Sequence, residues 1–132
     1  MSPQELMNAA LAAAEPAYAP YSGFRVGAAL LTRGGAVHVG CNVENASYGL
    51  GTCAERTAVF AMVAAGASDR TVASVAVASP DVSPCFPCGA CRQVLHEFGC
   101  ATVYVRTDDG EIRPHTLAEL LPHAFGPGDL RR

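Results

Sequence analysis

Three cysteines and one glutamate have the spacing of a metal site that performs chemistry. Cys-Ala-Glu at positions 53–55 is followed by Pro-Cys-Gly-Ala-Cys at positions 87–91. Cys88 and Cys91, three residues apart at the start of a helix, can bind one tetrahedral metal ion, and Cys53 at the start of another helix can add a third thiolate. Both helix N-termini favour the anionic form of sulfur. Three protein ligands leave the fourth position of zinc open to water, as in catalytic zinc sites.

Glu55 stands two residues from the first of these cysteines. At that distance its carboxylate can lie beside the metal without coordinating it together with Cys53. It can accept a proton from a zinc-activated water and deliver that proton to a substrate. A ligand-x-Glu segment followed by Pro-Cys-x-x-Cys is the order found in zinc deaminases that act on nucleobases, where the first ligand is His or Cys.

Cys85 leaves two other interpretations open. With Cys88 and Cys91 it gives the spacing at the start of a ferredoxin-type cluster motif, although Leu95 stands where the fourth cysteine should be. It can also complete a structural zinc site with four thiolates. We favour the catalytic zinc site and expect Cys85 to be a spectator. The other two cysteines are expected to be small core residues in or beside strands: Cys41 and Cys100.

Arg56 follows the glutamate directly. Three thiolates carry more negative charge than one zinc ion cancels, and this makes a bound water less acidic. The Arg56 guanidinium can hydrogen-bond a ligand thiolate and withdraw that charge. The alternative is an ordinary surface arginine on the first turn of a helix.

Asn42 and Glu44 form a second candidate group. They alternate at the end of an expected strand, so both side chains can leave it on one face. An amide beside a carboxylate offers suitable partners for ribose hydroxyls. Polar residues at a strand end are also commonly just solvated, and the pair by itself does not decide between the two.

Alternating helices and strands must position these residues. Apolar periodicity, caps and turn residues predict helices over 4–15, 53–65, 88–98 and 117–121, and strands over 24–32, 36–42, 72–79 and 102–106. The helix over 53–65 is apolar on nearly all sides and is expected to be buried. The irregular segment 44–51 is expected to be a functional loop. The pattern predicts an α/β domain with helices covering a mixed sheet.

The composition limits the classes of protein that the chain can represent. Its 132 residues fit one domain, 1–132, and 50% apolar with 16% charged residues argues against disorder. A net charge of −3 and nine scattered arginines argue against a nucleic-acid partner. No apolar run is long enough for a membrane span, and no signal peptide is visible, so we expect no membrane partner and a cytoplasmic location with reduced thiols.

Over about residues 17–130 the sequence resembles the small homotetrameric branch of the cytidine deaminase family. The resemblance is carried by residues 21–22, 24–29, 40–48, 53–58 and 87–95. It implies a three-layer α/β/α fold with a mixed five-stranded sheet, and a homotetramer whose active sites are completed by neighbouring subunits. It also implies one zinc ion per chain and hydrolytic deamination of free cytidine and deoxycytidine, with release of ammonia, in pyrimidine salvage.

Single residues gain roles from the same resemblance. Cys53, Cys88 and Cys91 match the zinc ligands of the family and Glu55 its proton shuttle. The other matching positions are substrate contacts: the Phe24 ring beside the base, Asn42 and Glu44 at the ribose 3′-hydroxyl, the Ala54 amide at the pyrimidine carbonyl, the Phe86 carbonyl at the leaving amine, Tyr48 where subunits meet around the site, and Phe125 as a C-terminal aromatic that reaches a neighbouring subunit's site.

One departure from the family pattern precedes the first ligand. The family usually reads Tyr-Gly-Leu-Thr-x-Cys, whereas positions 48–53 read Tyr-Gly-Leu-Gly-Thr-Cys, and Gly51 is expected to loosen this loop. Deaminases of aminonucleoside antibiotics of the blasticidin type share the zinc motifs and remain an alternative. The Asn-Val-Glu-Asn-Ala-Ser run at 42–47 favours the cytidine branch.

Overall fold

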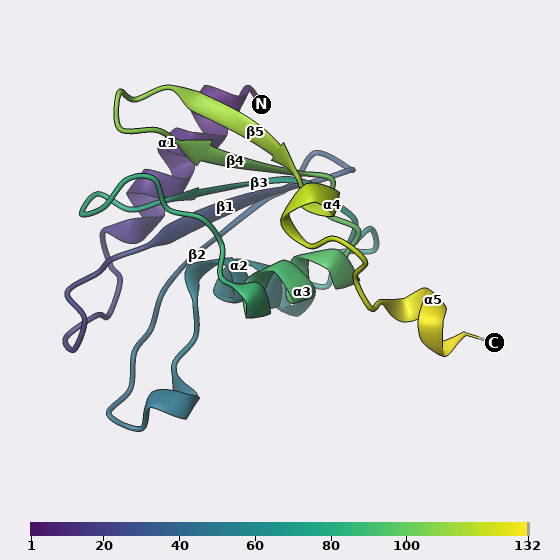
Figure 1. Cartoon of the computed structure of the whole chain (residues 1–132), viewed down its shortest axis with the longest axis horizontal. Helices are drawn as coiled ribbons and strands as arrows, with labels where there is room; N and C mark the ends of the chain where they lie inside the picture. The colour runs from purple at the N-terminus through teal and green to yellow at the C-terminus, as the bar shows by residue number, and fades with distance from the viewer. Residues whose placement is uncertain (132) are drawn as a thin grey trace.

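One mixed sheet organises the chain in the computed structural model, which describes residues 1–131 (Figure 1). Its strands stand in the order β2-β1-β3-β4-β5. Only the pair β3–β4 is parallel, and the other neighbours are antiparallel. The bounds are β1 Gly27–Thr32, β2 Val37–Cys41, β3 Val72–Ala78, β4 Thr102–Arg106 and β5 Ile112–Thr116.

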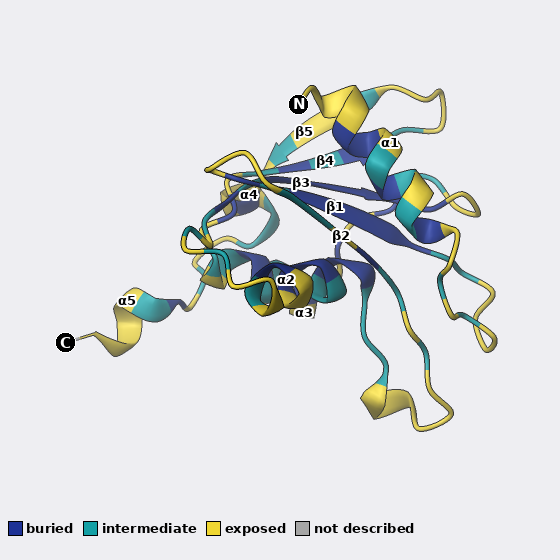
Figure 2. Ribbon diagram, turned by 180° about the vertical axis from the view of Figure 1, so that it is seen from behind, coloured by how far each residue is buried: buried dark blue, intermediate teal, exposed yellow. Residues whose placement is uncertain are grey.

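Helices cover both faces of this sheet (Figures 1 and 2). Helix α1, Pro3–Ala14, lies on one face, and α2, Ala54–Ala64, lies with α3, Gly89–Glu97, on the other. Three short helices lie outside these layers: η1 Tyr48–Leu50, α4 Leu117–Leu120 and α5 Pro127–Leu130. The predicted three-layer α/β/α arrangement with a mixed five-stranded sheet is confirmed. Among residues 1–131, no helix has the length and apolar composition that crossing a bilayer requires.

The two faces of the central strands differ in side-chain size. Successive residues of a strand point to opposite faces, so Val75 and Val77 of β3 join the core beneath α2, whereas Ala76 and Ala78 join the core beneath α1. These small side chains let α1 approach the sheet closely. A capping box between Ser2 and Glu5 stabilises the start of this helix. The larger valine face meets α2 and α3, which carry the candidate metal ligands at their N-termini.

Helix α1 approaches the sheet closely at Gly27, the first residue of β1. A Cβ atom added there would lie 1.9 Å from the carbonyl oxygen of Ala10, which belongs to the helix backbone. Gly27→Ala is therefore expected to lower the free energy of unfolding by about 3 kcal/mol, because α1 must move away from the sheet. Urea unfolding would measure the loss. The control is Gly34→Ala, whose added Cβ would meet no atom closer than 3.9 Å, and an equal loss in both variants would contradict the argument.

Two strand predictions differ from the structure. The strand predicted from residue 24 begins at Gly27, because the backbone of 24–26 bonds mostly to the side chains of Ser22, Asn42 and Asp81, and only the Val26 carbonyl accepts a backbone N–H, that of Asn42. Strand β5 was not predicted from the pattern. It is an edge strand with little buried surface and contains Pro114, which edge strands tolerate and central strands do not.

Candidate metal and catalytic site

The three cysteines predicted as metal ligands meet where α2 and α3 begin. Cys53 is the N-cap of α2, Cys88 is the N-cap of α3, and Cys91 lies in the first turn of α3. The sulfur of Cys88 lies 3.8 Å from that of Cys53 and 3.5 Å from that of Cys91, and all three sulfurs lie within 4.8 Å of one another. Thiolates around tetrahedral zinc are about 3.8 Å apart, since each Zn–S bond is about 2.3 Å. The cluster of Cys53, Cys88 and Cys91, called the thiol group below, therefore fits a zinc ion.

Positive charge stands beside this group. The Arg56 guanidinium donates a hydrogen bond from Nη2 to the sulfur of Cys53 over 3.2 Å. Hydrogen bonds from Cys91 and then from Arg56 lower the pKa of Cys53 to about 5, so that this sulfur is anionic at neutral pH. The contact is the one expected for an arginine that withdraws charge from a ligand thiolate, although Arg56 Nε has no hydrogen-bond partner among the described residues.

Glu55 is enclosed by protein next to the thiols. Its side chain lies at the start of α2, and only 4% of the residue is exposed. Burial raises the pKa of Glu55 to about 7, and the negative charge of Cys53 adds to this effect. A carboxyl group with a pKa near neutrality can both accept and donate a proton at physiological pH. The position and the environment both suit a proton shuttle.

Cys85 does not join the thiol group. Among the described residues, the candidate metal group contains Cys53, Cys88 and Cys91 alone. Cys85 is buried in the core cluster, and this burial raises the pKa of its thiol to about 11. Because Cys85 lies outside this group of close sulfurs, the geometry favours a three-thiolate site over the four-thiolate and cluster alternatives. Cys100 is buried in the same core as expected, whereas Cys41 is half-buried at the end of β2.

Asn42 and Glu44 follow β2 and bond to the segment that precedes β1. Asn42 accepts a hydrogen bond from the backbone N–H of Val26 over 2.9 Å and donates one to the carbonyl of Phe24 over 2.8 Å. Glu44 accepts from the backbone N–H groups of Tyr21 and Ser22 at 3.0 and 3.1 Å and from the Ser22 hydroxyl. Both side chains thus hold the chain before β1, a bracing role that sequence reasoning missed, because it depends on contacts between distant segments.

Glu44 also lines a cavity of about 380 Å³. The wall includes the exposed ring of Tyr48, which meets the ring of Tyr21 edge to face at 6.1 Å between centroids. Gly51, the position that departs from the family pattern, lies on the same wall. The structure therefore brings two of the predicted substrate contacts, Glu44 and Tyr48, to one cavity.

Comparison with known proteins agrees with this site. Residues 1–107 match the family model described as the cytidine and deoxycytidylate deaminase zinc-binding region. The chain belongs to the cytidine deaminase family. A cytidine deaminase of Halalkalibacterium halodurans is 48% identical over 98% of this chain and 98% of its own. One from Mycobacterium tuberculosis is 46% identical over 96% of this chain and 92% of its own.

Solved structures of the family share the fold. The crystal structure of cytidine deaminase from Burkholderia pseudomallei superimposes with a TM-score of 0.87 at 51% identity, and covers 95% of this chain and 100% of that one. The cytidine deaminase from M. tuberculosis gives a TM-score of 0.83 at 43% identity over 96% and 98% of the two chains. The zinc-binding region of the family includes all three cysteines of the thiol group.

The remaining residues predicted from the cytidine deaminase family lie in different places. Phe24 packs against the core cluster that contains Ala54. Ala54 is fully buried at the start of α2. Phe86 is partly exposed and meets the ring of His115 edge to face. Phe125 is 60% exposed in the segment between α4 and α5 and lines a separate hollow beside α3. Within the described part of one chain, Phe125 does not line the cavity of Glu44 and Tyr48.

Proposed function

We propose that this chain is a zinc-dependent cytidine deaminase that hydrolyses free cytidine and deoxycytidine to uridine and deoxyuridine with release of ammonia. The observation that carries the proposal is the buried carboxyl of Glu55, which stands beside three thiols at zinc-binding distances. The names of full-length relatives at 46–48% identity support the same reaction.

Proton transfer in this reaction falls to Glu55. Cys53, Cys88 and Cys91 would hold the zinc ion, which would make a water molecule acidic enough, with a pKa toward ~7, to act as the nucleophile. Glu55 takes one proton from the water as the water oxygen bonds to C4, and gives this proton to N3 of the base. It then moves the second proton of that oxygen to the amino group, so that the C4–N bond breaks, ammonia leaves and C4 becomes a carbonyl. A pKa of about 7 suits Glu55 to both directions of transfer.

Substrate binding is assigned to the residues around this centre. We infer that the backbone N–H of Ala54 donates to the pyrimidine carbonyl, that the carbonyl of Phe86 accepts from the leaving amine, and that the ring of Phe24 packs beside the base. Asn42 and Glu44 hold the ribose 3′-hydroxyl. The bonds that they make to the protein leave room for this, because an amide oxygen accepts two hydrogen bonds, an amide nitrogen donates two, and a carboxylate offers about four acceptor positions.

The proposed assembly is a homotetramer in which neighbours complete each site. Large apolar side chains stand exposed on the single chain, with Tyr48 at 81% and Phe125 at 60%. Apolar surface of this kind is typical of interfaces between subunits. In this assembly Tyr48 lies where subunits meet and Phe125 reaches a neighbour's site. We further propose that residues 1–132 form one catalytic domain that acts in cytoplasmic pyrimidine salvage, without nucleic-acid or membrane partners.

Ammonia release from four substrates tests the proposed function. Cytidine and deoxycytidine are expected to be deaminated. Blasticidin S is not, because the run at 42–47 favours the cytidine branch. Single-stranded oligonucleotides are not, because a chain with a net charge of −3 and scattered arginines is a poor partner for a phosphate backbone. Metal analysis of the same sample should give one zinc per chain, and sedimentation should give a tetramer. Deamination of blasticidin S without deamination of cytidine would replace the proposal by the antibiotic alternative.

Arg56 provides a graded test of the zinc centre. Arg56→Met removes the hydrogen bond to Cys53 at 3.2 Å while keeping an unbranched apolar stem. We expect kcat for cytidine to fall about tenfold with zinc still bound, because the thiolates then donate more charge to the metal. Steady-state kinetics with metal analysis measures both quantities. The control is Arg70→Met, at an exposed arginine outside the site, and equal kcat in both variants would make Arg56 an ordinary surface residue.

A further inference from the structure

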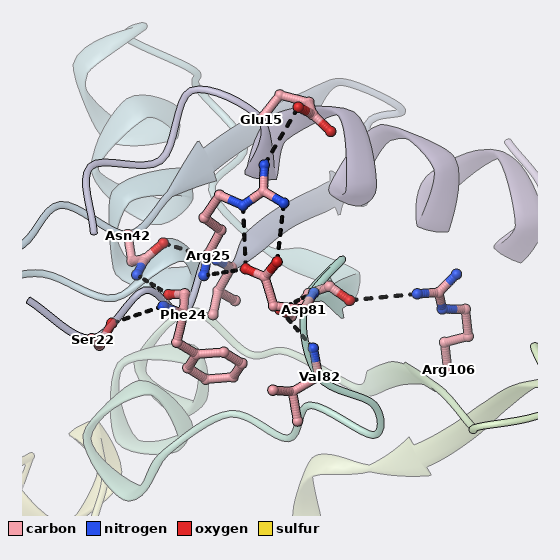
Figure 3. A network of polar contacts seen from close by, with 10 residues as sticks. Glu15, Ser22, Phe24, Arg25, Asn42, Asp81, Val82 and Arg106 are labelled. Atoms are coloured by element: carbon pink, nitrogen blue, oxygen red, sulfur yellow. Dashed lines mark hydrogen bonds and ion pairs between the residues drawn. The ribbon is translucent and has the colours of Figure 1, made fainter. Parts of the chain in front are cut away.

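Arg25 and Asp81 form a polar clamp between two segments 56 residues apart in the sequence (Figure 3). Asp81 accepts three hydrogen bonds from Arg25: from the backbone N–H at 2.9 Å, from Nε at 3.2 Å and from Nη2 at 3.0 Å. The bonds from the Arg25 side chain hold the pKa of Asp81 below its ordinary value, so the carboxylate is charged at neutral pH. The guanidinium also lies 3.6 Å from Glu15 at the end of α1.

The Asp81 side of the clamp is itself fixed. The backbone N–H groups of Asp81 and Val82 donate to the hydroxyl of Ser79 at 3.0 and 3.3 Å. Ser79 is buried at the end of β3, and its carbonyl accepts a hydrogen bond from Arg106 at the end of β4. Asp81 therefore holds Arg25 from a loop that is tied to two central strands.

On the other side of the clamp stands Phe24. Its N–H donates to the Ser22 hydroxyl at 3.0 Å, and its carbonyl accepts from Asn42 at 2.8 Å. With the bond from the Arg25 N–H to Asp81, the backbone on both sides of Phe24 is held by side chains rather than by a strand. Figure 3 shows the Phe24 ring pointing away from the ion pair, to the same side as Val82. The ring packs against the core cluster that contains Ala54 and Cys85.

We propose that Arg25 and Asp81 are positioning residues that fix the Phe24 ring for the nucleoside base and so set the affinity for substrate. The inference rests on the proposed function, in which Phe24 packs beside that base. Neither residue has a hydrogen bond to the thiols or to Glu55 among the described contacts. Packing against the base is equally strong before and during the reaction, so loss of the clamp raises KM and leaves kcat nearly unchanged.

A second ion pair in the same sheet is a matched control. Arg33 donates from Nε to Asp69 at 3.1 Å, and Asp69 also accepts a backbone N–H, from Thr71, at 3.0 Å. Strands β1 and β3 are antiparallel, with Gly27 opposite Ala78 at one end and Thr32 opposite Val72 at the other. The two arginine–aspartate pairs thus close opposite ends of the same strand pair, and only the Arg25–Asp81 pair holds Phe24.

The test compares steady-state kinetics on cytidine for wild type, Asp81→Ala, Arg25→Met, the double variant and Asp69→Ala, with zinc content and thermal unfolding measured on each. Asp81→Ala is expected to raise KM about tenfold with kcat within about twofold of wild type.

Arg25→Met is expected to raise KM less, because Asp81 still accepts the backbone N–H of residue 25. The double variant should match Asp81→Ala alone, since both residues act as one unit. Asp69→Ala should also lower the unfolding temperature but leave KM unchanged.

Several outcomes would overturn the inference while leaving the proposed function in place. If the wild type is active and Asp81→Ala has the same KM for cytidine, the clamp does not position the Phe24 ring. Equal KM changes in Asp81→Ala and Asp69→Ala would reduce the clamp to a general contribution to stability. A fall in kcat with unchanged KM would also contradict it. A zinc-loaded wild type that does not deaminate cytidine would instead refute the proposed function, and the inference with it.

Discussion

Glu55→Gln is expected to retain zinc and cytidine and to lose turnover by roughly 10⁴-fold, the upper end of what a positioned proton-transfer group contributes. Glutamine has nearly the same shape as glutamate and can still form hydrogen bonds at the buried position, but it cannot accept a proton from water at neutral pH. Glu55 is 4% exposed, so bulk water has little access through which to replace the missing proton path. Single-turnover deamination of cytidine measures the loss of rate.

Binding must be measured beside turnover to separate a lost proton path from a damaged site. Calorimetric titration with cytidine and zinc analysis should give values close to those of wild type for Glu55→Gln. The matched control is Glu97→Gln, a change of the same chemistry at an exposed glutamate at the end of α3, which should leave kcat unchanged. Deamination by Glu55→Gln at near the wild-type rate would assign the proton transfer to another group.

The thiol group was predictable from sequence because its geometry is local. A cysteine at a helix N-cap and another three residues later must lie on the same side of the first turn, as Cys88 and Cys91 do. The position of Cys53 beside them followed from joining two helix starts at one metal ion. Glu55 followed in turn, since two residues separate it from a ligand. The Cys88–Cys91 pair and the place of Glu55 beside Cys53 need the conformation of only a few consecutive residues, whereas Cys53, 35 residues before Cys88, joins them only through the metal site that the motif implies.

The contacts that surround the thiol group were not predictable in this way. The ribose role of Asn42 comes from the resemblance to the cytidine deaminase family, and its place at a strand end gives no sign that both groups of its amide bond to the backbone around Phe24. The Arg25–Asp81 clamp depends on the register of β1 against β3. No periodicity along the chain encodes which loop residues a sheet register brings together. The edge strand β5 was not predicted for a different reason. It has almost no buried face, so its sequence has no alternating apolar pattern.

Cys88→Ser is expected to lose both zinc and activity, whereas Cys85→Ser is expected to keep both. The two residues lie three apart in one segment, but only the sulfur of Cys88 lies within 4 Å of both other candidate ligands, at 3.8 Å from Cys53 and 3.5 Å from Cys91. Serine replaces a thiolate by a neutral hydroxyl that does not ionise at neutral pH, so the site keeps two anionic ligands. Structural thiolates contribute a large part of the ~10–16 kcal/mol with which such sites bind zinc. Metal analysis after dialysis should therefore fall from one zinc per chain to near zero.

The same pair of variants decides between the open and the closed metal site. If Cys85 were a fourth ligand, its replacement by serine would release zinc as readily as the replacement of Cys88. Its place in the core cluster, outside the group of sulfurs that lie within 4.8 Å of one another, argues against this. Three ligands leave one position for water, and the deamination mechanism requires that position. Retention of zinc together with full cytidine turnover in Cys85→Ser thus supports the chemistry as well as the ligand set, and loss of zinc from that variant would remove the position where water must bind.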